Sequence, residues 1–303
     1  HANVWAPMSV DAERGLVFLP TTSPSPDFYG GLRPGDNRHA NSVVALDAET
    51  GRVEWAFQTV HHDVWDYDVP AQPGLYSVWK DGRSHDVVAQ VTKTGLLFVL
   101  DRDTGEPFLP IEERPVPPGI VEGEVLSPTQ PFPVATPPIV PNTVDPADAF
   151  GITWFDKREC RKMLESSRAE GLYTPPSEEG TILLPFTGGG ANWGGAAFDP
   201  ARNLLVVNMS NLAHHIQLFR ADALETMREV YHDQEVSPQE GAPFGMKRVT
   251  ALSSLGLPCT PPPWGIIAGI DLASGNIVWR RTIGTTEDLS LGPGAKLGTP
   301  TLG

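Results

Sequence analysis

The sequence predicts an all-β protein in which a repeated unit of strands and turns forms part of a β-propeller. One pattern, A-x-D-x3-G-x3-W at residues 45–55, returns almost unchanged at 269–279, and a degenerate copy lies at 101–105. A second pattern, W-x5-D-x3-G followed by an apolar strand at residues 5–19, returns at 193–207 with Asn in place of Gly. Such self-similarity is typical of propellers and solenoids, because each unit buries its face on the next one.

Each pattern has a structural interpretation. Asp and Gly favour a tight turn between two strands, and the Trp that follows is suited to packing between neighbouring sheets. We therefore expect an open arc of antiparallel four-stranded blades. Asp47, Gly51 and Trp55 should lie in a turn between blades, and Trp55 and Trp279 should be buried against a neighbouring sheet.

Two parts of the chain interrupt the repeats. Residues 107–149 are rich in Pro and lack periodicity, which indicates a long excursion from the propeller. Residues 157–169 and 220–232 have the pattern of short amphipathic helices. We interpret residues 1–303 as part of a single propeller domain with loop and helical insertions near 107–180 and 212–250.

Composition narrows the class of protein. The 303 residues include 31 Pro and 30 Gly, as expected where many strands are joined by turns. The formal net charge of −15 argues against a nucleic-acid partner. The sequence contains no apolar run long enough to span a membrane and no signal peptide.

The two cysteines, Cys160 and Cys259, leave two alternatives open. They form a disulfide in an oxidising compartment, or they are two separate buried thiols. The sequence has no C-x-x-C-H motif, so it predicts no covalently attached haem.

The stretch HHDVWDYD at residues 61–68 is the strongest candidate for chemistry, with three carboxylates, two histidines and two aromatic residues. A carboxylate held beside apolar walls becomes more basic, which suits it to accept a proton from a substrate. The alternative is an ordinary polar loop around one buried Trp.

Several blocks of sequence carry a resemblance to a known family. They are NVWAPMSVD at 3–11, PDFYGG at 26–31, QTVHHDVWDYDVPAQ at 58–72, LPC at 257–259 and PWG at 263–265. In this order they resemble the membrane-bound quinoprotein dehydrogenases that use pyrroloquinoline quinone (PQQ), in the glucose/quinate/shikimate group. The resemblance implies an eight-bladed quinoprotein propeller, of which about four blades are present here, since each large blade needs several tens of residues.

The resemblance implies a role for Asp66 as the catalytic base and as a ligand to a divalent cation, Ca²⁺ or Mg²⁺. Asp63 and Asp68 are the alternatives. We expect Asp63 to bond the backbone of its loop and Asp68 to be solvated. Asp66 would accept the proton of the substrate hydroxyl while a hydride passes to PQQ.

Two further residues are implied as cofactor-binding. Lys93, 27 residues after Asp66, would stabilise the negative charge that develops on the quinone oxygens. The alternative for Lys93 is a surface position at the start of a strand. Trp5 would provide a flat floor for the planar cofactor, and its alternative is a Trp that packs between blades.

The remaining candidates come from the same resemblance. Ser23 lies in the turn that carries an Asn metal ligand in alcohol-oxidising relatives, and a hydroxyl is a poorer ligand than an amide carbonyl. Asn208, with Asn211 as the rival, would contact PQQ. His62 would orient Asp66 or touch the substrate. We interpret the pair at 214–215 as loop histidines without a metal.

The implied function is PQQ-dependent oxidation of a sugar or polyol, with electrons passed to ubiquinone in the membrane. Glucose is the first choice of substrate, and quinate, shikimate or glycerol are the alternatives. We expect the protein at the periplasmic face of the bacterial inner membrane, with its anchor and further blades outside this chain, so that the chain alone is inactive. The rival hypothesis is a non-catalytic periplasmic propeller scaffold.

Overall fold

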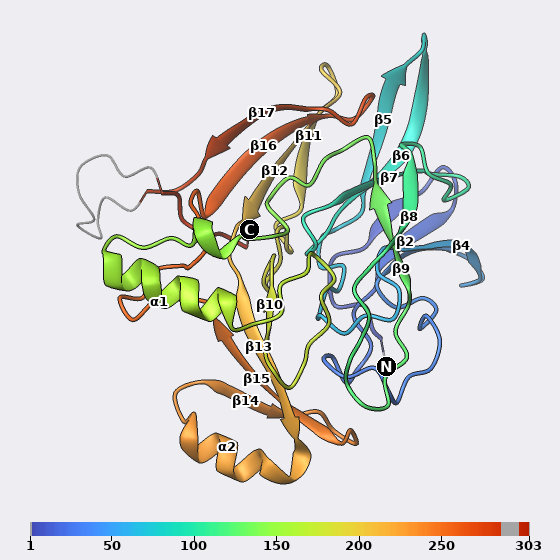
Figure 1. The fold of residues 1–303 in the computed structure, drawn as a ribbon. Coiled ribbons are helices and arrows are strands. Elements are labelled where there is room, and N and C mark those ends of the chain that lie inside the picture. Colours follow the sequence, from blue (N-terminus) through green and yellow to red (C-terminus); the bar gives the residue numbers. More distant parts are fainter. Residues whose placement is uncertain (1, 286–296, 303) are drawn as a thin grey trace.

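A computed structural model describes residues 2–285 and 297–302, and these residues form an arc of β-sheets (Figure 1). The first sheet is an antiparallel meander in the order β1-β2-β3-β4. The second has the order β5-β6-β7, and the third has the order β11-β12-β16-β17. The strands of the first two sheets are β1 (Ser9–Asp11), β2 (Leu16–Pro20), β3 (Ser42–Asp47), β4 (Val53–Gln58), β5 (Gly74–Lys80), β6 (Arg83–Val91) and β7 (Leu97–Asp101). Those of the third are β11 (Ala196–Asp199), β12 (Leu204–Ser210), β16 (Gly265–Asp271) and β17 (Ile277–Thr282).

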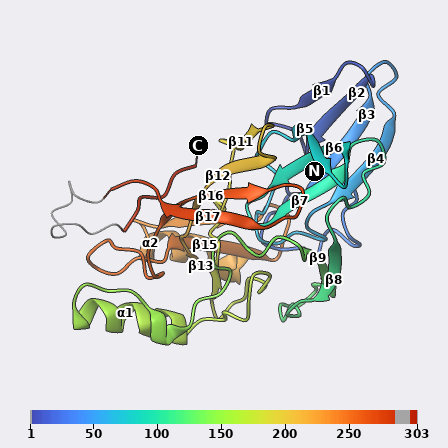
Figure 2. The ribbon, with the colours of Figure 1, turned by 90° about the horizontal axis from the view of Figure 1, so that it is seen from above.

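The three meander sheets pack face to face as propeller blades do. Alternate residues of β6 point to opposite sides, as the two-residue period of a strand requires. Val88 belongs to the apolar cluster shared with the first sheet, and Val87 and Ala89 belong to the cluster shared with the third. The second blade is therefore buried on both faces, and the described sheets form an open arc rather than a closed ring (Figure 2). This confirms the predicted partial propeller.

A fourth sheet, called here the inserted sheet, has three strands in the segment between β12 and β16 of the third blade, and its edge strand β10 precedes β11. Its order is β10-β13-β15-β14, and the short helix α2 connects two of its strands. The sheet lies beside the arc, with α2 at the lower end of the molecule in Figure 1. The predicted number of about four blades is matched by the number of large sheets, but only three of them are meanders. The bounds are β10 (Thr181–Leu183), β13 (His214–Arg220), η2 (Ala221–Ala223), α2 (Leu224–Val230), β14 (Glu235–Pro238) and β15 (Phe244–Thr250).

The excursion predicted at 107–149 contains a two-stranded ribbon, β8 (Ile111–Pro115) and β9 (Thr129–Pro133), and a turn of 3₁₀-helix, η1 (Pro146–Asp148). The helix α1 (Trp154–Glu165) follows, close to the predicted 157–169. Thr153 begins α1, because its hydroxyl accepts a hydrogen bond from the backbone N–H of Asp156. None of the described helices is long and apolar enough to cross a membrane.

The repeated Asp–Gly patterns form the predicted tight turns, but they lie within blades. Asp47 and Gly51 connect β3 to β4 of the same sheet, and the carbonyl of Asp47 accepts the N–H of Gly51 at 2.8 Å. Gly51 has a φ of 71°, a left-handed conformation that glycine adopts without strain. The expectation of a turn between blades is therefore wrong, because the turn joins β3 to β4, and the equivalent turn of the third blade joins β16 to β17.

The Trp of the pattern does join one blade to the next. Trp55 is buried, and its indole N–H donates to the carbonyl of Arg102 at 3.1 Å, in the turn that follows β7. A Cβ on Gly105 in that turn would lie 2.5 Å from the Trp55 ring, so only glycine allows this approach. Trp279, at the equivalent position of the third blade, is only half-buried in the described part of the chain.

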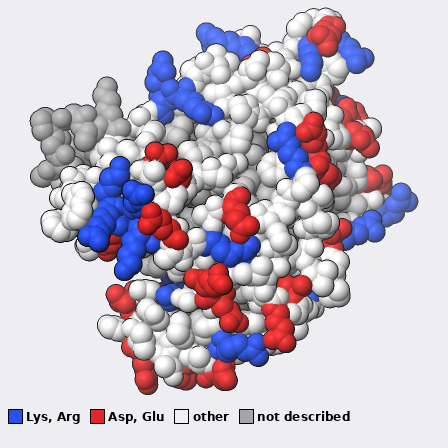
Figure 3. Space-filling view, in the orientation of Figure 1, with Lys and Arg blue, Asp and Glu red and all other residues white. Residues whose placement is uncertain are grey.

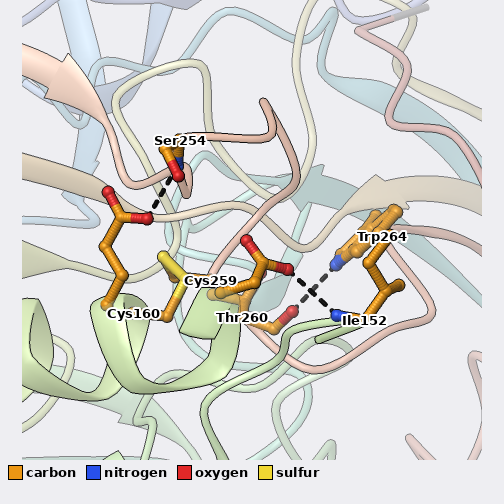
Figure 4. The surroundings of a disulfide bond; sticks show 8 residues. Ile152, Cys160, Ser254, Cys259, Thr260 and Trp264 are labelled. Carbon is orange, nitrogen blue, oxygen red and sulfur yellow. Dashed lines mark hydrogen bonds between the residues drawn. A yellow bond between two sulfur atoms is a disulfide. The ribbon is translucent and has the colours of Figure 1, made fainter. Parts of the chain in front are cut away.

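Cys160 and Cys259 form a disulfide, which settles the alternative that the sequence left open (Figure 4). Cys160 lies on α1, and Cys259 lies in the segment between β15 and β16. Both cysteines are fully buried in an apolar cluster with Leu164 and Ile182. The bond therefore ties α1 to a segment that leads into the third blade.

We expect loss of this disulfide to lower the stability markedly. Replacing both cysteines by Ala should reduce the free energy of unfolding by about 2–5 kcal/mol, because the bond closes a long loop in the unfolded chain. The bonded residues are separated by 99 positions. Chemical denaturation of the double variant and of the parent protein measures the difference. If the double variant and the oxidised parent protein have the same denaturation midpoint, the bond adds no stability.

Candidate functional site

The loop that carries the candidate base is fixed by two buried aromatic residues on either side of it. Trp65 and Tyr67 are 1% and 0% exposed. The Trp65 indole N–H donates to the carbonyl of Thr174 at 2.9 Å, and the Tyr67 hydroxyl donates to the carbonyl of Pro185 at 2.5 Å. Both rings also contact Tyr173 edge-on. Because its neighbours point into the core, Asp66 is held at the opposite side of the loop.

Asp63 organises the same loop from inside. Its carboxylate accepts the backbone N–H of Trp65 at 3.2 Å and that of Tyr67 at 3.1 Å. The hydroxyl of Ser23 donates to it at 2.5 Å. The prediction that Asp63 bonds the backbone of its loop is confirmed. Ser23 supports the loop through Asp63 in this structure, and its contact with a cofactor stays a prediction.

Asp66 lies at the centre of a cluster of charges. Its backbone is left-handed, with a φ of 58°, a conformation that costs free energy for a residue with a Cβ and that is common at functional sites. Its Oδ1 lies 3.2 Å from the Nζ of Lys93. Burial raises the pKa of Asp66 to about 7, with Lys93 opposing the rise and the carboxylates of Asp68 and Asp27 adding to it. A carboxylate with such a pKa is suited to accept a proton near neutral pH.

Lys93 is the cation of this cluster, and it is not the surface lysine of the alternative interpretation. The residue is 6% exposed. Its ammonium donates to the backbone carbonyl of Asp66 at 2.9 Å and forms ion pairs with the carboxylates of Asp66 and Asp68. Burial by itself lowers the pKa of Lys93, but the two carboxylates outweigh it and raise the pKa above its usual value. The ammonium is therefore held in its charged form.

The burial of Asp68 differs from the expectation that this residue is solvated. Asp68 is 5% exposed, because it pairs with Lys93 and accepts the indole N–H of Trp5 at 3.0 Å. This hydrogen bond brings Trp5 to the charged cluster, and its contact with a cofactor stays a prediction. Trp5 is 54% exposed, so it is not a packing residue between blades. Its ring is anchored at one edge and open on the rest of its surface.

Two members of the cluster were missed by the sequence analysis. Arg248 on β15 places its Nη1 3.6 Å from the Oδ2 of Asp66. Asp27 is half-buried and close enough to Lys93 and Asp68 for their charges to affect its pKa, which burial raises above the usual value. Asp27 was within reach of sequence reasoning, because it lies in the PDFYGG block. Arg248 has no such signal, since it belongs to the inserted sheet.

The other candidates lie outside the cluster. The ring nitrogens of His62 lie 2.6 Å from the carbonyl oxygen of Gly35 and 3.2 Å from that of Gly30, so His62 braces that loop and does not contact Asp66. Asn208 is half-buried on β12, paired with Ile267, and no hydrogen bond joins it to Asp66 or Lys93. Its contact with PQQ stays a prediction. Asn211 is buried and donates to the carbonyls of Pro261 and Pro263.

The histidine pair at 214–215 is not in a loop, because both residues lie on β13. His214 is buried, and its Nδ1 lies 3.2 Å from the hydroxyl of Thr187. Burial lowers the pKa of His214 to about 3, with the charges of Arg248 and Lys93 acting in the same direction. A neutral imidazole thus lies near the charged cluster.

A cavity of about 700 Å³ has Asp27 on its wall, but Asp66, Lys93 and Trp5 do not line it. Arg33 is also on its wall, together with Gln239, the residue that follows β14. Gln239 accepts the backbone N–H of Phe28 at 2.9 Å, which ties the two walls together. On the face shown in Figure 3 charged side chains of both signs are interspersed over the surface. The charges around Asp66 differ from these because they are largely buried.

The arrangement fits part of a site for a planar, anionic quinone. An exposed tryptophan ring and a buried ammonium are both linked to Asp68. The side chains of the described residues do not form a complete metal site. Among residues 2–285 and 297–302, no three His, Cys, Asp or Glu side chains come together as metal ligands. That Asp66 shares a divalent cation with ligands supplied by the cofactor stays a prediction.

Comparison with known proteins gives one family. The family model described as "PQQ: Glucose/ethanol/alcohol dehydrogenase, beta-propeller domain" matches residues 1–303. The quinoprotein glucose dehydrogenase of Escherichia coli is 40% identical over 294 residues, which cover 94% of this chain and 37% of that protein. The quinate/shikimate dehydrogenase (quinone) of Acinetobacter baylyi is 37% identical, with 99% of this chain and 39% of that protein covered. The chain thus spans about two fifths of the length of these relatives.

A solved structure supports the fold. The europium-containing methanol dehydrogenase superposes with a TM-score of 0.57 at 21% identity, over 92% of this chain and 39% of that one. At this identity the likeness shows the propeller fold alone. The arc of blades therefore corresponds to a portion of a larger propeller.

Proposed function

Because the chain belongs to the PQQ-dependent glucose/ethanol/alcohol dehydrogenase β-propeller family, we propose that it carries the catalytic base of an enzyme that oxidises a sugar or polyol. Glucose is the first choice of substrate, since a glucose dehydrogenase is among the most similar relatives. Quinate, shikimate and glycerol are the alternatives. Ubiquinone is the proposed electron acceptor, at the periplasmic face of the inner membrane.

The observation that carries the proposal is the convergence of Asp66, Lys93 and Trp5. A carboxylate with a pKa near neutral, a buried ammonium 3.2 Å from it and an open indole ring lie in one cluster. A scaffold protein gains nothing from burying these charges, because burial of charged groups costs free energy. This argument favours an enzyme over the scaffold hypothesis.

We assign the chemical roles as follows. Asp66 accepts the proton of the substrate hydroxyl, and its fixed loop holds the carboxylate in place for this step. Lys93 keeps a positive charge where negative charge develops in the transition state. Trp5 forms the flat surface on which the cofactor lies. When bound, PQQ supplies the carbonyl that accepts the hydride. A Ca²⁺ or Mg²⁺ ion would share the carboxylate of Asp66.

The test uses the full-length protein. We expect the apoprotein to take up one equivalent of PQQ, seen as a shift of the quinone absorption band, and then to reduce an artificial dye when a substrate is added. Glucose, quinate, shikimate and glycerol are compared at equal concentrations. Binding of PQQ without turnover of any sugar or polyol would contradict the assigned substrate class. Absence of PQQ binding would contradict the whole proposal.

A further inference from the structure

Arg248 approaches the carboxylate oxygen of Asp66 that Lys93 does not. The two cations come from different parts of the fold, because Lys93 precedes β7 of the second blade and Arg248 lies on β15 of the inserted sheet. Lys93 approaches Oδ1 of Asp66 at 3.2 Å, and Arg248 approaches Oδ2 at 3.6 Å. Each oxygen of the carboxylate therefore has a cation of its own.

The guanidinium of Arg248 is fixed by partners other than Asp66. Its Nε and Nη2 donate to one oxygen of Glu235 at 2.9 Å and 2.6 Å. Its Nη1 donates to the hydroxyl of Thr187 at 2.8 Å, and that hydroxyl in turn faces Nδ1 of His214 at 3.2 Å. Long side chains lose rotamer entropy when they are ordered. Here the ordering is provided by Glu235 and Thr187, independently of Asp66.

The distance of 3.6 Å between Nη1 of Arg248 and Oδ2 of Asp66 defines the kind of contact. It is within reach of an ion pair but longer than a charge-assisted hydrogen bond. Glu235 takes the close contacts, so part of the positive charge of Arg248 is already balanced. Arg248 can thus restrict where Oδ2 of Asp66 points without forming a close hydrogen bond to it.

We propose that Arg248 is a positioning residue for the catalytic base. This inference rests on the proposed function of Asp66. Arg248 and Lys93 together fix the plane of the Asp66 carboxylate, so that the oxygen that takes the proton faces the substrate. The inserted sheet is then part of the active site, since β14 supplies Glu235 and β15 supplies Arg248 (Figure 1).

The test compares Arg248→Gln, Arg248→Lys and Glu235→Gln in the full-length holoenzyme. Arg248→Gln should lower kcat by about tenfold or more, since small errors in the position of a catalytic group are costly. KM and the stoichiometry of PQQ binding should stay near those of the parent. Arg248→Lys should recover part of kcat, because it restores the charge, and Glu235→Gln should give an intermediate loss.

Arg228→Gln is the matched control. Arg228 pairs with Glu225 on the surface of α2, 3.0 Å apart, so the variant removes an ion pair from the same inserted region without touching Asp66. We expect Arg228→Gln to keep the kcat, the KM and the stoichiometry of PQQ binding of the parent. An Arg248→Gln enzyme with unchanged kcat, or an Arg248→Lys enzyme no better than Arg248→Gln, overturns the inference.

A crystal structure of Arg248→Gln gives a readout that does not depend on turnover. We expect the Asp66 carboxylate to occupy more than one orientation in the variant and one in the parent. If the parent oxidises no sugar or polyol, the proposed function fails, and the orientation of Asp66 still decides the role of Arg248. A single, unchanged Asp66 conformer in the variant shows that Arg248 does not position it.

Discussion

Replacing Asp66 by Asn in the full-length enzyme should slow turnover by about a hundredfold or more, the usual contribution of a general base. The amide has nearly the same size, but it cannot accept the proton of the substrate hydroxyl. Binding of PQQ should persist, because Lys93 and Trp5 remain. Dye reduction under saturating substrate measures kcat, and the quinone absorption band measures the amount of bound cofactor.

Two other carboxylates provide the comparison. Asp63→Asn should act on stability, since this side chain holds the loop through two backbone N–H groups and Ser23. Asp68→Asn should weaken the hold on Trp5 and Lys93 and therefore act on cofactor binding. An Asp66→Asn enzyme that turns over at the parental rate would transfer the role of base to one of these two residues.

The sequence was sufficient to predict the repeated architecture. The Asp–Gly turns and the alternating apolar strands are local signals, and local signals determine hairpins. Their place within blades, rather than between them, was predicted wrongly. The reason is physical: a hairpin turn reads the same in sequence whether the strands it joins share a sheet or not. The inserted sheet was not predicted as a sheet, because the segment near 212–250 was interpreted as a loop and helical insertion, and β10 lies far from that segment in the sequence.

The candidate site was predicted only in part, because some of its residues have a local sequence signal and others do not. Asp66 and Trp5 belong to short blocks that resemble a family, and the same resemblance implies a role for Lys93; the structure brings the three residues into one charge cluster. The burial of Asp68 was missed, because alternation along a strand gave it a solvent-facing side. In the structure it follows a loop with Asp66 in a left-handed conformation, which breaks that alternation. Arg248 was missed because only tertiary structure brings the inserted sheet to Asp66.

Lys93 should be the residue whose loss affects both stability and cofactor retention. In Lys93→Met the side chain keeps its length, but Asp66 and Asp68 lose the ammonium that they share. Removing one partner of a buried charge cluster costs about 3–5 kcal/mol, because the remaining charge is buried without compensation. We expect a fall of this size in the free energy of unfolding at pH 8, measured by denaturant titration, together with weaker binding of PQQ.

The cause of the stability loss in Lys93→Met can be identified from its pH dependence and from two further variants, Asp68→Asn and Lys247→Met. Without Lys93 the pKa of Asp66 should rise further above about 7, its value with Lys93 present. A carboxyl whose pKa is raised in the folded state binds its proton more tightly there than in the unfolded chain. The deficit of Lys93→Met should therefore shrink as the pH falls from 8 towards 5. Adding Asp68→Asn to Lys93→Met should recover part of the stability.

Lys247→Met is the control for loss of a buried lysine as such, since Lys247 is 7% exposed and its ammonium lies 4.0 Å from the centre of the Tyr231 ring. It should cost only about 0.5–2 kcal/mol, the range of a cation–π contact. If Lys93→Met and Lys247→Met are equally stable and the pH has no effect on the difference, unpaired carboxylates are not the cause. The charge cluster would then not depend on Lys93, and the assignment of Lys93 as the cation that balances Asp66 would have to be withdrawn.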